Sequence, residues 1–113
     1  MDERFGNLVE LYRFFTDAYA ARPYLGTKRD GAWSYITYAD FKRQVDAFRG
    51  GLRRLGVAVG DRVALVANNR VEWAVAAYAS YGLRAAIVPL YEAQAASEWA
   101  FVLRDSGAKV ALA

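Results

Sequence analysis

The chain has 113 residues, of which 15 are basic and 12 acidic, giving a net charge of +3. Hydrophobic residues make up 56% of it and aromatic residues 15%, so burial can offset the entropy lost on folding and disorder is not expected. Cysteine and histidine are absent, which excludes disulfides, thiolate metal sites, a thiol nucleophile and the usual general base.

The N-terminal segment predicts an amphipathic helix that begins after Asn7 and runs to about Ala21. Asn7 can cap this helix, and Arg22-Pro23 is expected to end it, because the residue before proline is pushed out of the α region. The apolar residues recur at spacings that place them on one face: Leu8, Leu11, Phe15 and Tyr19. The segment begins with acidic residues and has no continuous apolar run, so it does not resemble a signal peptide.

A hairpin and a second amphipathic helix are expected next. Tyr24 to Lys28 and Trp33 to Tyr35 read as two short strands around an Asp30-Gly31 turn, a dipeptide typical of hairpins. Thr37 is the expected N-cap of the following helix, with Asp40 three residues on as its capping-box partner. An unbroken apolar stripe follows, made of Tyr38, Phe41, Val45, Phe48, Leu52 and Leu55.

Glycines mark two positions in this second helix. Gly56 is expected to end it as a C′ glycine. Gly50-Gly51 lies inside it, where each glycine costs about 1 kcal/mol relative to alanine. Since glycine lets a neighbouring element come close, the pair predicts close approach of another element at that point.

The segment from Gly60 to Leu90 predicts a strand, a helix and a second strand. Val63 to Ala67 is apolar without polar alternation, as in a strand that is buried on both faces. A helix is expected from Arg70 to Tyr81, capped by Asn68-Asn69 and ended by a left-handed Gly82. Ala86-Ile87-Val88 then begins a strand that Pro89 is expected to stop. Such a βαβ unit has parallel strands.

The C-terminal segment predicts one more helix and one more parallel strand. Ser97 is the expected N-cap of a helix that Gly107 ends, with Trp99, Val102 and Leu103 on one face. Lys109 to Ala113 reads as the third strand. The predicted class is α/β: a parallel β-α-β-α-β unit preceded by an amphipathic helix, a short hairpin and a second amphipathic helix. Because two amphipathic helices scarcely cover both faces of a parallel sheet, we expect residues 1–113 to be the front part of a larger domain.

Polar residues at the expected strand ends are the first candidates for a functional site. Asn68 and Asn69 lie beyond the carboxyl end of the first parallel strand, where open α/β sheets place ligands, although capping of the next helix would also explain them. Tyr91 and Glu92 follow Pro89 at a second strand end, where a role on the substrate side of the cleft is an alternative to a plain loop.

The remaining candidates have simpler structural explanations. A basic face on the second helix could touch phosphates, but it has no interleaved aromatic residues and a solvated surface is the preferred interpretation; its members are Lys42, Arg43, Arg49, Arg53 and Arg54. Trp73 and Trp99 are expected to pack in the core. Glu72 and Glu98 stand alone, so roles in solvent or at helix starts suit them better than acid–base chemistry.

Several of these stretches resemble the adenylate-forming (AMP-binding) superfamily. Ile36 to Phe41 is similar to its first core motif, L-[TS]-Y-x-E-L, and Tyr81 to Leu90 to its second, with Ala85 where the family often has Gly-Ala earlier in the run. Between them lies a run similar to G-V-x-x-G-D-R-V-A … N-x-x-E-W, formed by Gly56-Val57, Gly60 to Ala64 and Asn69 to Trp73. The segments Glu98 to Leu103 and Ser106 to Val110 continue the pattern.

The resemblance implies a function and several partners. Val88 to Glu92 is most similar to the long-chain fatty acyl-CoA ligase branch, whose members use ATP and Mg²⁺ to adenylate a carboxylate and then transfer the acyl group to CoA. The family's phosphate loop, Mg²⁺ glutamate, ribose aspartate and catalytic lysine have no counterpart here. We therefore assign no catalytic, cofactor-binding or metal-binding residue, expect no cofactor bound to this segment, and expect the segment alone to be inactive.

The expected partners are the remainder of the adenylation domain, a C-terminal lid domain and a fatty acid, and nucleic acid is not among them. The longest apolar run, Trp73 to Tyr81, is too short to span a bilayer, so we expect a cytoplasmic location, with peripheral association at a membrane as an open alternative. A non-enzymatic α/β binding or interaction module that pairs through an exposed sheet edge is the alternative function.

Overall fold

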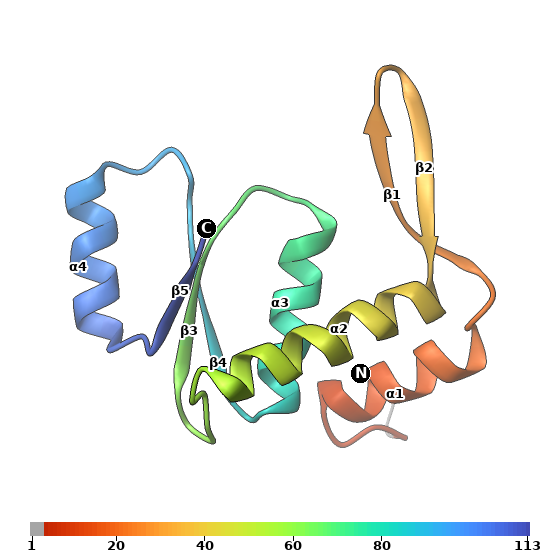
Figure 1. Ribbon diagram of the computed structural model, residues 1–113, viewed down its shortest axis with the longest axis horizontal. Coiled ribbons are helices and arrows are strands. Elements are labelled where there is room, and N and C mark those ends of the chain that lie inside the picture. Colours follow the sequence, from red (N-terminus) through yellow and green to blue (C-terminus); the bar gives the residue numbers. More distant parts are fainter. Residues whose placement is uncertain (1–3) are drawn as a thin grey trace.

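A computed structural model describes residues 4–113, so the first three residues of the expected domain lie outside the described part. Two antiparallel strands form a hairpin, and three parallel strands form a sheet (Figure 1). The elements in chain order are α1 (Leu8–Ala18), β1 (Pro23–Arg29), β2 (Ala32–Thr37), α2 (Tyr38–Arg54), β3 (Arg62–Val66), α3 (Val71–Gly82), β4 (Ala86–Leu90), α4 (Ala96–Ser106) and β5 (Val110–Leu112). The predicted α/β class and element order are confirmed.

The parallel sheet has the order β4-β3-β5, so β3 lies in the middle. Its register pairs Val63 with Ile87 of β4 and with Val110 of β5. The crossover through α3 lies on one face of the sheet and the crossover through α4 on the other (Figure 1). Right-handed crossovers require this arrangement, because the two connections run in opposite directions across the sheet. The connection through α3 leads from β3 to the edge strand β4, and the connection through α4 leads back past β3 to β5. The loops that follow β3 and β4 therefore leave the same edge of the sheet toward opposite faces.

The core lies between the sheet and the helices α1, α2 and α3. Phe41 and Val45 of α2 are fully buried, and Val63 of β3 and Ala79 of α3 complete the contact. Most of the predicted α2 stripe therefore faces the core. Leu55, the last member of the stripe, is 62% exposed, because it is the C-cap residue beyond the last turn of α2.

Local hydrogen bonds form the ends of α2 as predicted. The Thr37 hydroxyl accepts from the Asp40 N–H at 3.0 Å, and the Asp40 carboxylate accepts from the Thr37 N–H at 3.1 Å, which completes a capping box. At the other end Gly56 has φ +90°, and the N–H of Val57 donates to the Leu52 carbonyl at 3.1 Å. This is a Schellman motif, which needs a left-handed residue at the Gly56 position.

The hairpin is also confirmed and is longer than predicted. Asp30 and Gly31 have φ values of +52° and +78°, as a type I′ turn requires at both central positions. Cross-strand pairs run from Arg29 with Ala32 at the turn to Pro23 with Thr37 at the base. The hairpin stands away from the body of the molecule, and its base leads directly into α2 (Figure 1).

The first helix differs from the prediction in length and in its buried face. Asn7 caps it, but it ends at Ala18 with Tyr19 as the C-cap, and the chain then turns, with the N–H of Arg22 donating to the Tyr19 carbonyl at 2.8 Å. Its buried residues are Tyr12 and Thr16. The outer members of the predicted apolar face, Leu8 and Tyr19, remain 40% and 36% exposed.

Three predictions about the βαβ unit are wrong. Arg70 stands at the N-cap of α3 and no side chain caps the helix, so Asn68-Asn69 does not serve that role. The left-handed residue after α3 is Arg84, with φ +56°, because the chain turns two residues beyond Gly82. Pro89 does not stop β4: it pairs with Leu65 inside the strand, where the edge position of β4 tolerates a missing N–H.

The predicted close approach at Gly50-Gly51 is also wrong for the described residues. A Cβ atom built on either glycine would meet nothing within 4 Å. In α4 the N-cap is Ala95 and not Ser97, while Gly107 ends the helix in the left-handed conformation with φ +64° as predicted. No residue of α4 is buried, so this helix covers little of the sheet.

Candidate functional site

A crevice opens at the carboxyl edge of the parallel sheet, between β3 and β4. Because the loops after these neighbouring strands run to opposite faces, this is a topological switch point, where open α/β sheets bind ligands. A cavity of about 610 Å³ lies there. Its lining combines the β3–α3 loop, the end of β4, the loop after it and one side chain of α3: Ala67, Asn68, Asn69, Trp73, Pro89, Leu90, Tyr91, Glu92 and Ala93.

The structure thus brings together the strand-end candidates of the sequence. Asn68 and Asn69 from one loop meet Tyr91 and Glu92 from the other across the same cavity. Trp73 was predicted to pack in the core, but it is half-buried and forms part of the cavity wall, because it lies in the first turn of α3, next to the β3–α3 loop.

Hydrogen bonds hold the loop on the β4 side of the crevice. The Tyr91 N–H donates to Oε1 of Gln94 at 3.1 Å, and the indole Nε1 of Trp99 donates to the Tyr91 carbonyl at 2.8 Å. Trp99 was expected in the core, but it is only half-buried and serves to tie α4 to this loop. The Tyr91 side chain is 79% exposed at the mouth of the crevice.

The chemistry of the lining limits what the crevice can bind. Phosphates need cations or clustered N–H groups, yet the side chains that line the cavity include no lysine or arginine and do include the carboxylate of Glu92. No group of three or more His, Cys, Asp or Glu residues within residues 4–113 could hold a metal ion. The lining of this crevice therefore offers neither a cation for a triphosphate nor a cluster of carboxylates for a metal ion. Two amides and two aromatic rings suit an uncharged part of a ligand that offers hydrogen bonds and apolar surface.

The isolated glutamates have the local roles expected of them. Glu72 forms an ion pair with Arg70 at 3.1 Å, and its own backbone N–H at the start of α3, together with Arg70, lowers the pKa of Glu72. Glu98 accepts a hydrogen bond from the N–H of Ala95 at 3.3 Å, in the first turn of α4. Both carboxylates therefore stabilise helix N-termini.

The basic face of α2 is a solvated surface with intrahelical ion pairs. Lys42 lies 2.5 Å from Asp46, and Arg43 contacts Asp40. Both cations remain largely exposed, as do Arg53 and Arg54. Partnered and solvated cations of this kind are ordinary for a helix surface, as the sequence predicts. Arg49, the fifth member of the predicted face, differs, because it is half-buried and lies against Gly82 of α3.

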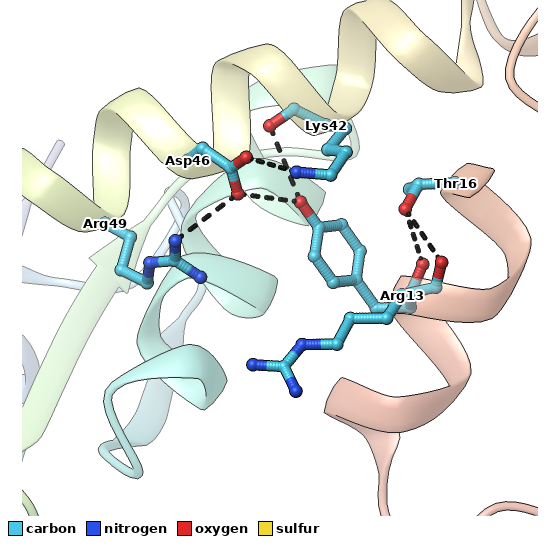
Figure 2. A network of polar contacts seen from close by, with 6 residues as sticks. Arg13, Thr16, Lys42, Asp46 and Arg49 are labelled. Atoms are coloured by element: carbon cyan, nitrogen blue, oxygen red, sulfur yellow. Dashed lines mark hydrogen bonds and ion pairs between the residues drawn. The ribbon is translucent and has the colours of Figure 1, made fainter.

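A polar network between α1 and α2 was not found from the sequence. Tyr12 is 3% exposed, and its hydroxyl donates to Oδ1 of Asp46 at 3.2 Å (Figure 2). Burial, and the neighbouring Asp46 carboxylate, raise the pKa of Tyr12 far above its usual range, so the phenol stays protonated. The Thr16 hydroxyl turns back to the Tyr12 carbonyl at 2.8 Å.

Asp46 is the centre of this network. Burial acts to raise the pKa of its carboxyl, but the hydrogen bond and charge of Lys42 and the nearby Arg49, at 3.6 Å, outweigh burial and lower it (Figure 2). None of the residues of this network lines the crevice. It holds α1 against α2, and its residues are structural.

The fold and the crevice define an open parallel α/β protein with a candidate ligand crevice at a switch point. The sequence pattern of the family described as AMP-binding enzyme matches residues 15–113. The chain belongs to this family.

The relatives include enzymes of acyl-CoA formation. The long-chain-fatty-acid–CoA ligase FadD15 of Mycobacterium bovis is 40% identical over 84 residues, which are 74% of this chain and 14% of that protein. A feruloyl-CoA synthase of an Amycolatopsis species is 37% identical over 66% of this chain and 15% of its own length. The chain thus spans about a seventh of the length of these curated relatives.

Solved structures share the fold. The Mycobacterium tuberculosis fatty acyl CoA synthetase superposes with a TM-score of 0.81 and 32% identity, over 97% of this chain and 22% of that one. The N-terminal domain of FACL13 from the same organism gives 0.82 and 31% over 95% of this chain and 26% of that one. The arrangement described above is therefore that of a part of the N-terminal domain of acyl-CoA synthetases.

Proposed function

We propose that residues 1–113 are the N-terminal part of the adenylation domain of an AMP-forming fatty acid–CoA ligase that acts on long-chain substrates. The observation that carries this is the 40% identity to a long-chain-fatty-acid–CoA ligase within a family match that runs from residue 15 to 113. The VPLYE sequence at the end of β4, which resembles that branch of the family, supports the same substrate class.

The proposed ligase binds ATP, Mg²⁺ and CoA with residues outside this segment. Support comes from the crevice, whose lining offers no cation for a triphosphate and no carboxylate cluster for a metal. The proposed partners of the segment are the remainder of the adenylation domain and the lid domain. The sheet agrees with this, since α4 buries none of its residues and leaves one face poorly covered.

In this proposal the crevice forms one wall of the substrate pocket. The amides of Asn68 and Asn69 and the indole of Trp73 contact an uncharged part of the substrate, whereas the carboxylate of Glu92 keeps phosphate groups away from this wall. No residue of the segment takes part in bond making or breaking. The proposed location of the enzyme is cytoplasmic, at the periphery of a membrane. No helix in residues 4–113 is both long and apolar enough to cross a bilayer.

The test is ATP–pyrophosphate exchange with a series of fatty acids of increasing chain length. Exchange is expected from the protein that carries this segment together with a downstream Ser/Thr/Gly-rich loop ending in Pro-Lys-Gly, and none from residues 1–113 alone. Exchange by residues 1–113 alone would contradict the proposal that the reactive groups lie outside this segment. Absence of that loop from the following hundred or so codons of the gene, or absence of exchange with every fatty acid, would refute the ligase.

A further inference from the structure

The wall of the crevice on the β4 side is a single tight turn. The Gln94 N–H donates to the Tyr91 carbonyl at 3.3 Å, which closes a four-residue β-turn directly after β4. The first three residues of this 91–94 turn, Tyr91, Glu92 and Ala93, all line the crevice. The position of the turn therefore sets the width of the crevice and the place of the Glu92 carboxylate in it.

Two nearby side chains fix the turn. Oε1 of Gln94 accepts from the Tyr91 N–H at 3.1 Å, and the indole Nε1 of Trp99 donates to the Tyr91 carbonyl at 2.8 Å. The Tyr91 carbonyl thus accepts two hydrogen bonds, one from within the turn and one from the start of α4. These bonds join residues no more than 8 positions apart, so they do not depend on the remainder of the larger domain.

The start of α4 does not need the indole of Trp99. The Ala95 N–H donates to the Glu98 carboxylate at 3.3 Å, and the Glu98 N–H donates to the Ala95 carbonyl at 2.9 Å, so backbone and Glu98 form this helix end. Trp99 is half-buried and is not among the residues that pack on the hydrophobic core. What its side chain does make is the hydrogen bond to the 91–94 turn, so the indole nitrogen connects α4 with the crevice wall.

We propose that Trp99 is a positioning residue for the substrate that occupies the crevice. It holds the 91–94 turn, and through the turn it fixes the Tyr91 phenol and the Glu92 carboxylate where the substrate meets them. A wall that is fixed before binding gives tighter binding, because ordering a mobile loop on binding costs free energy. The inference deepens the proposed function and rests on it, since the crevice is one wall of the substrate pocket of the proposed ligase.

This role predicts a particular pattern in the kinetics. A freed turn weakens binding of the substrate in the ground state and in the transition state alike, because no group of the turn makes or breaks a bond, so KM rises and kcat does not change. Removing the indole N–H is expected to raise the KM by about two- to fivefold. Fivefold corresponds to about 1 kcal/mol, the net contribution of one neutral hydrogen bond. A role of Trp99 in stability alone would lower the amount of active enzyme and leave KM unchanged.

The test is steady-state kinetics of the protein that carries this segment together with the remainder of its domains, with ATP, a long-chain fatty acid and CoA varied in turn. Trp99→Phe, which removes the N–H donor and keeps an aromatic ring, is expected to raise the KM of one substrate at least about twofold, with kcat unchanged. Gln94→Leu removes the acceptor of the Tyr91 N–H and should raise the KM of the same substrate. Gln94→Glu keeps an acceptor there and should have the parental KM.

The matched control is Phe101→Leu, which changes another aromatic side chain of α4, 67% exposed and not part of the crevice lining. It should leave all three KM values unchanged. Hydrogen exchange of the Gln94 amide reads the turn without catalysis and should be faster in Trp99→Phe than in the parent, because the turn opens more often.

Three kinetic results would overturn the inference: parental KM values in Trp99→Phe, a fall in kcat without a rise in KM, or a rise in KM that Gln94→Leu does not share. Unchanged exchange of the Gln94 amide in Trp99→Phe would overturn it as well. A parent protein that turns over no fatty acid would refute the ligase, and the inference with it. An active parent with parental KM values in Trp99→Phe would refute the inference alone.

Discussion

Substitution of Tyr12 by phenylalanine tests whether the network between α1 and α2 stabilises the fold. The change removes only the hydroxyl that donates to Asp46. The ring keeps its contacts, among them the stacked Tyr78 at 5.4 Å and the edge of Phe15 at 5.9 Å. A loss of stability in this variant therefore reports the hydrogen bond and not the packing.

The size of the loss follows from the geometry. A hydrogen bond to a charged partner contributes about 1.5–3 kcal/mol. The distance of 3.2 Å is long for a phenol donor, and Asp46 retains Lys42 at 2.5 Å and Arg49 at 3.6 Å, so no buried charge is left unpaired. We expect the free energy of unfolding to fall by about 1.5 kcal/mol, at the lower end of the range. Tyr12→Ala, which also opens a cavity, should cost about 3–5 kcal/mol.

The assay is urea denaturation of the Tyr12→Phe, Asp46→Asn and double variants at neutral pH. The slope of the unfolding free energy against urea concentration is expected to stay the same in all three variants. A coupling energy above about 0.5 kcal/mol is expected between the two positions, because they form one network. The pKa of Asp46 is lower in the folded protein than in the unfolded chain. The ionised carboxylate therefore stabilises the fold at pH values above the pKa that Asp46 has in the unfolded chain, and this stabilisation is lost as the pH falls through its pKa in the folded protein. The Tyr12→Phe penalty should shrink over the same acidic range. A penalty below about 0.3 kcal/mol, or one without coupling to Asp46, would refute the reasoning.

Three further predictions concern α2. Thr37→Ala should lower the free energy of unfolding by about 1 kcal/mol, because it removes the cap that accepts from the Asp40 N–H; an unchanged urea midpoint would contradict this. Asp40→Asn should weaken the fall of the melting temperature at acidic pH. The Thr37 N–H lowers the pKa of Asp40, so the stabilisation by the Asp40 carboxylate is lost as the pH falls through its pKa in the folded protein. An unchanged dependence of the melting temperature on acidic pH would count against this prediction. Gly51→Ala should raise the stability of the 113-residue chain by about 1 kcal/mol, because its Cβ meets nothing within 4 Å, and a measured loss would reveal a neighbour that residues 4–113 do not supply.

Features that depend on a few neighbouring residues were predictable from the sequence. The Thr37–Asp40 capping box, the Asp30-Gly31 turn and the left-handed Gly56 each form within about four residues of the chain. For the candidate site, the sequence placed Asn68, Asn69, Tyr91 and Glu92 at strand ends, which was enough to expect a ligand edge.

Features that depend on distant parts of the chain were not predictable. The burial of Tyr12 depends on Asp46, which lies 34 residues further along the sequence. Trp73 and Trp99 look alike as aromatic residues of helices, but one forms a crevice wall and the other a tie to the Tyr91 loop, according to what each helix packs against. The sequence alone determined the family and the order of the local elements, because periodicity and most turns act over short distances, although the caps of α3 and α4 were misplaced. Only the tertiary structure decided which side chains share a cavity, which are buried and which face solvent, because these depend on how the elements pack.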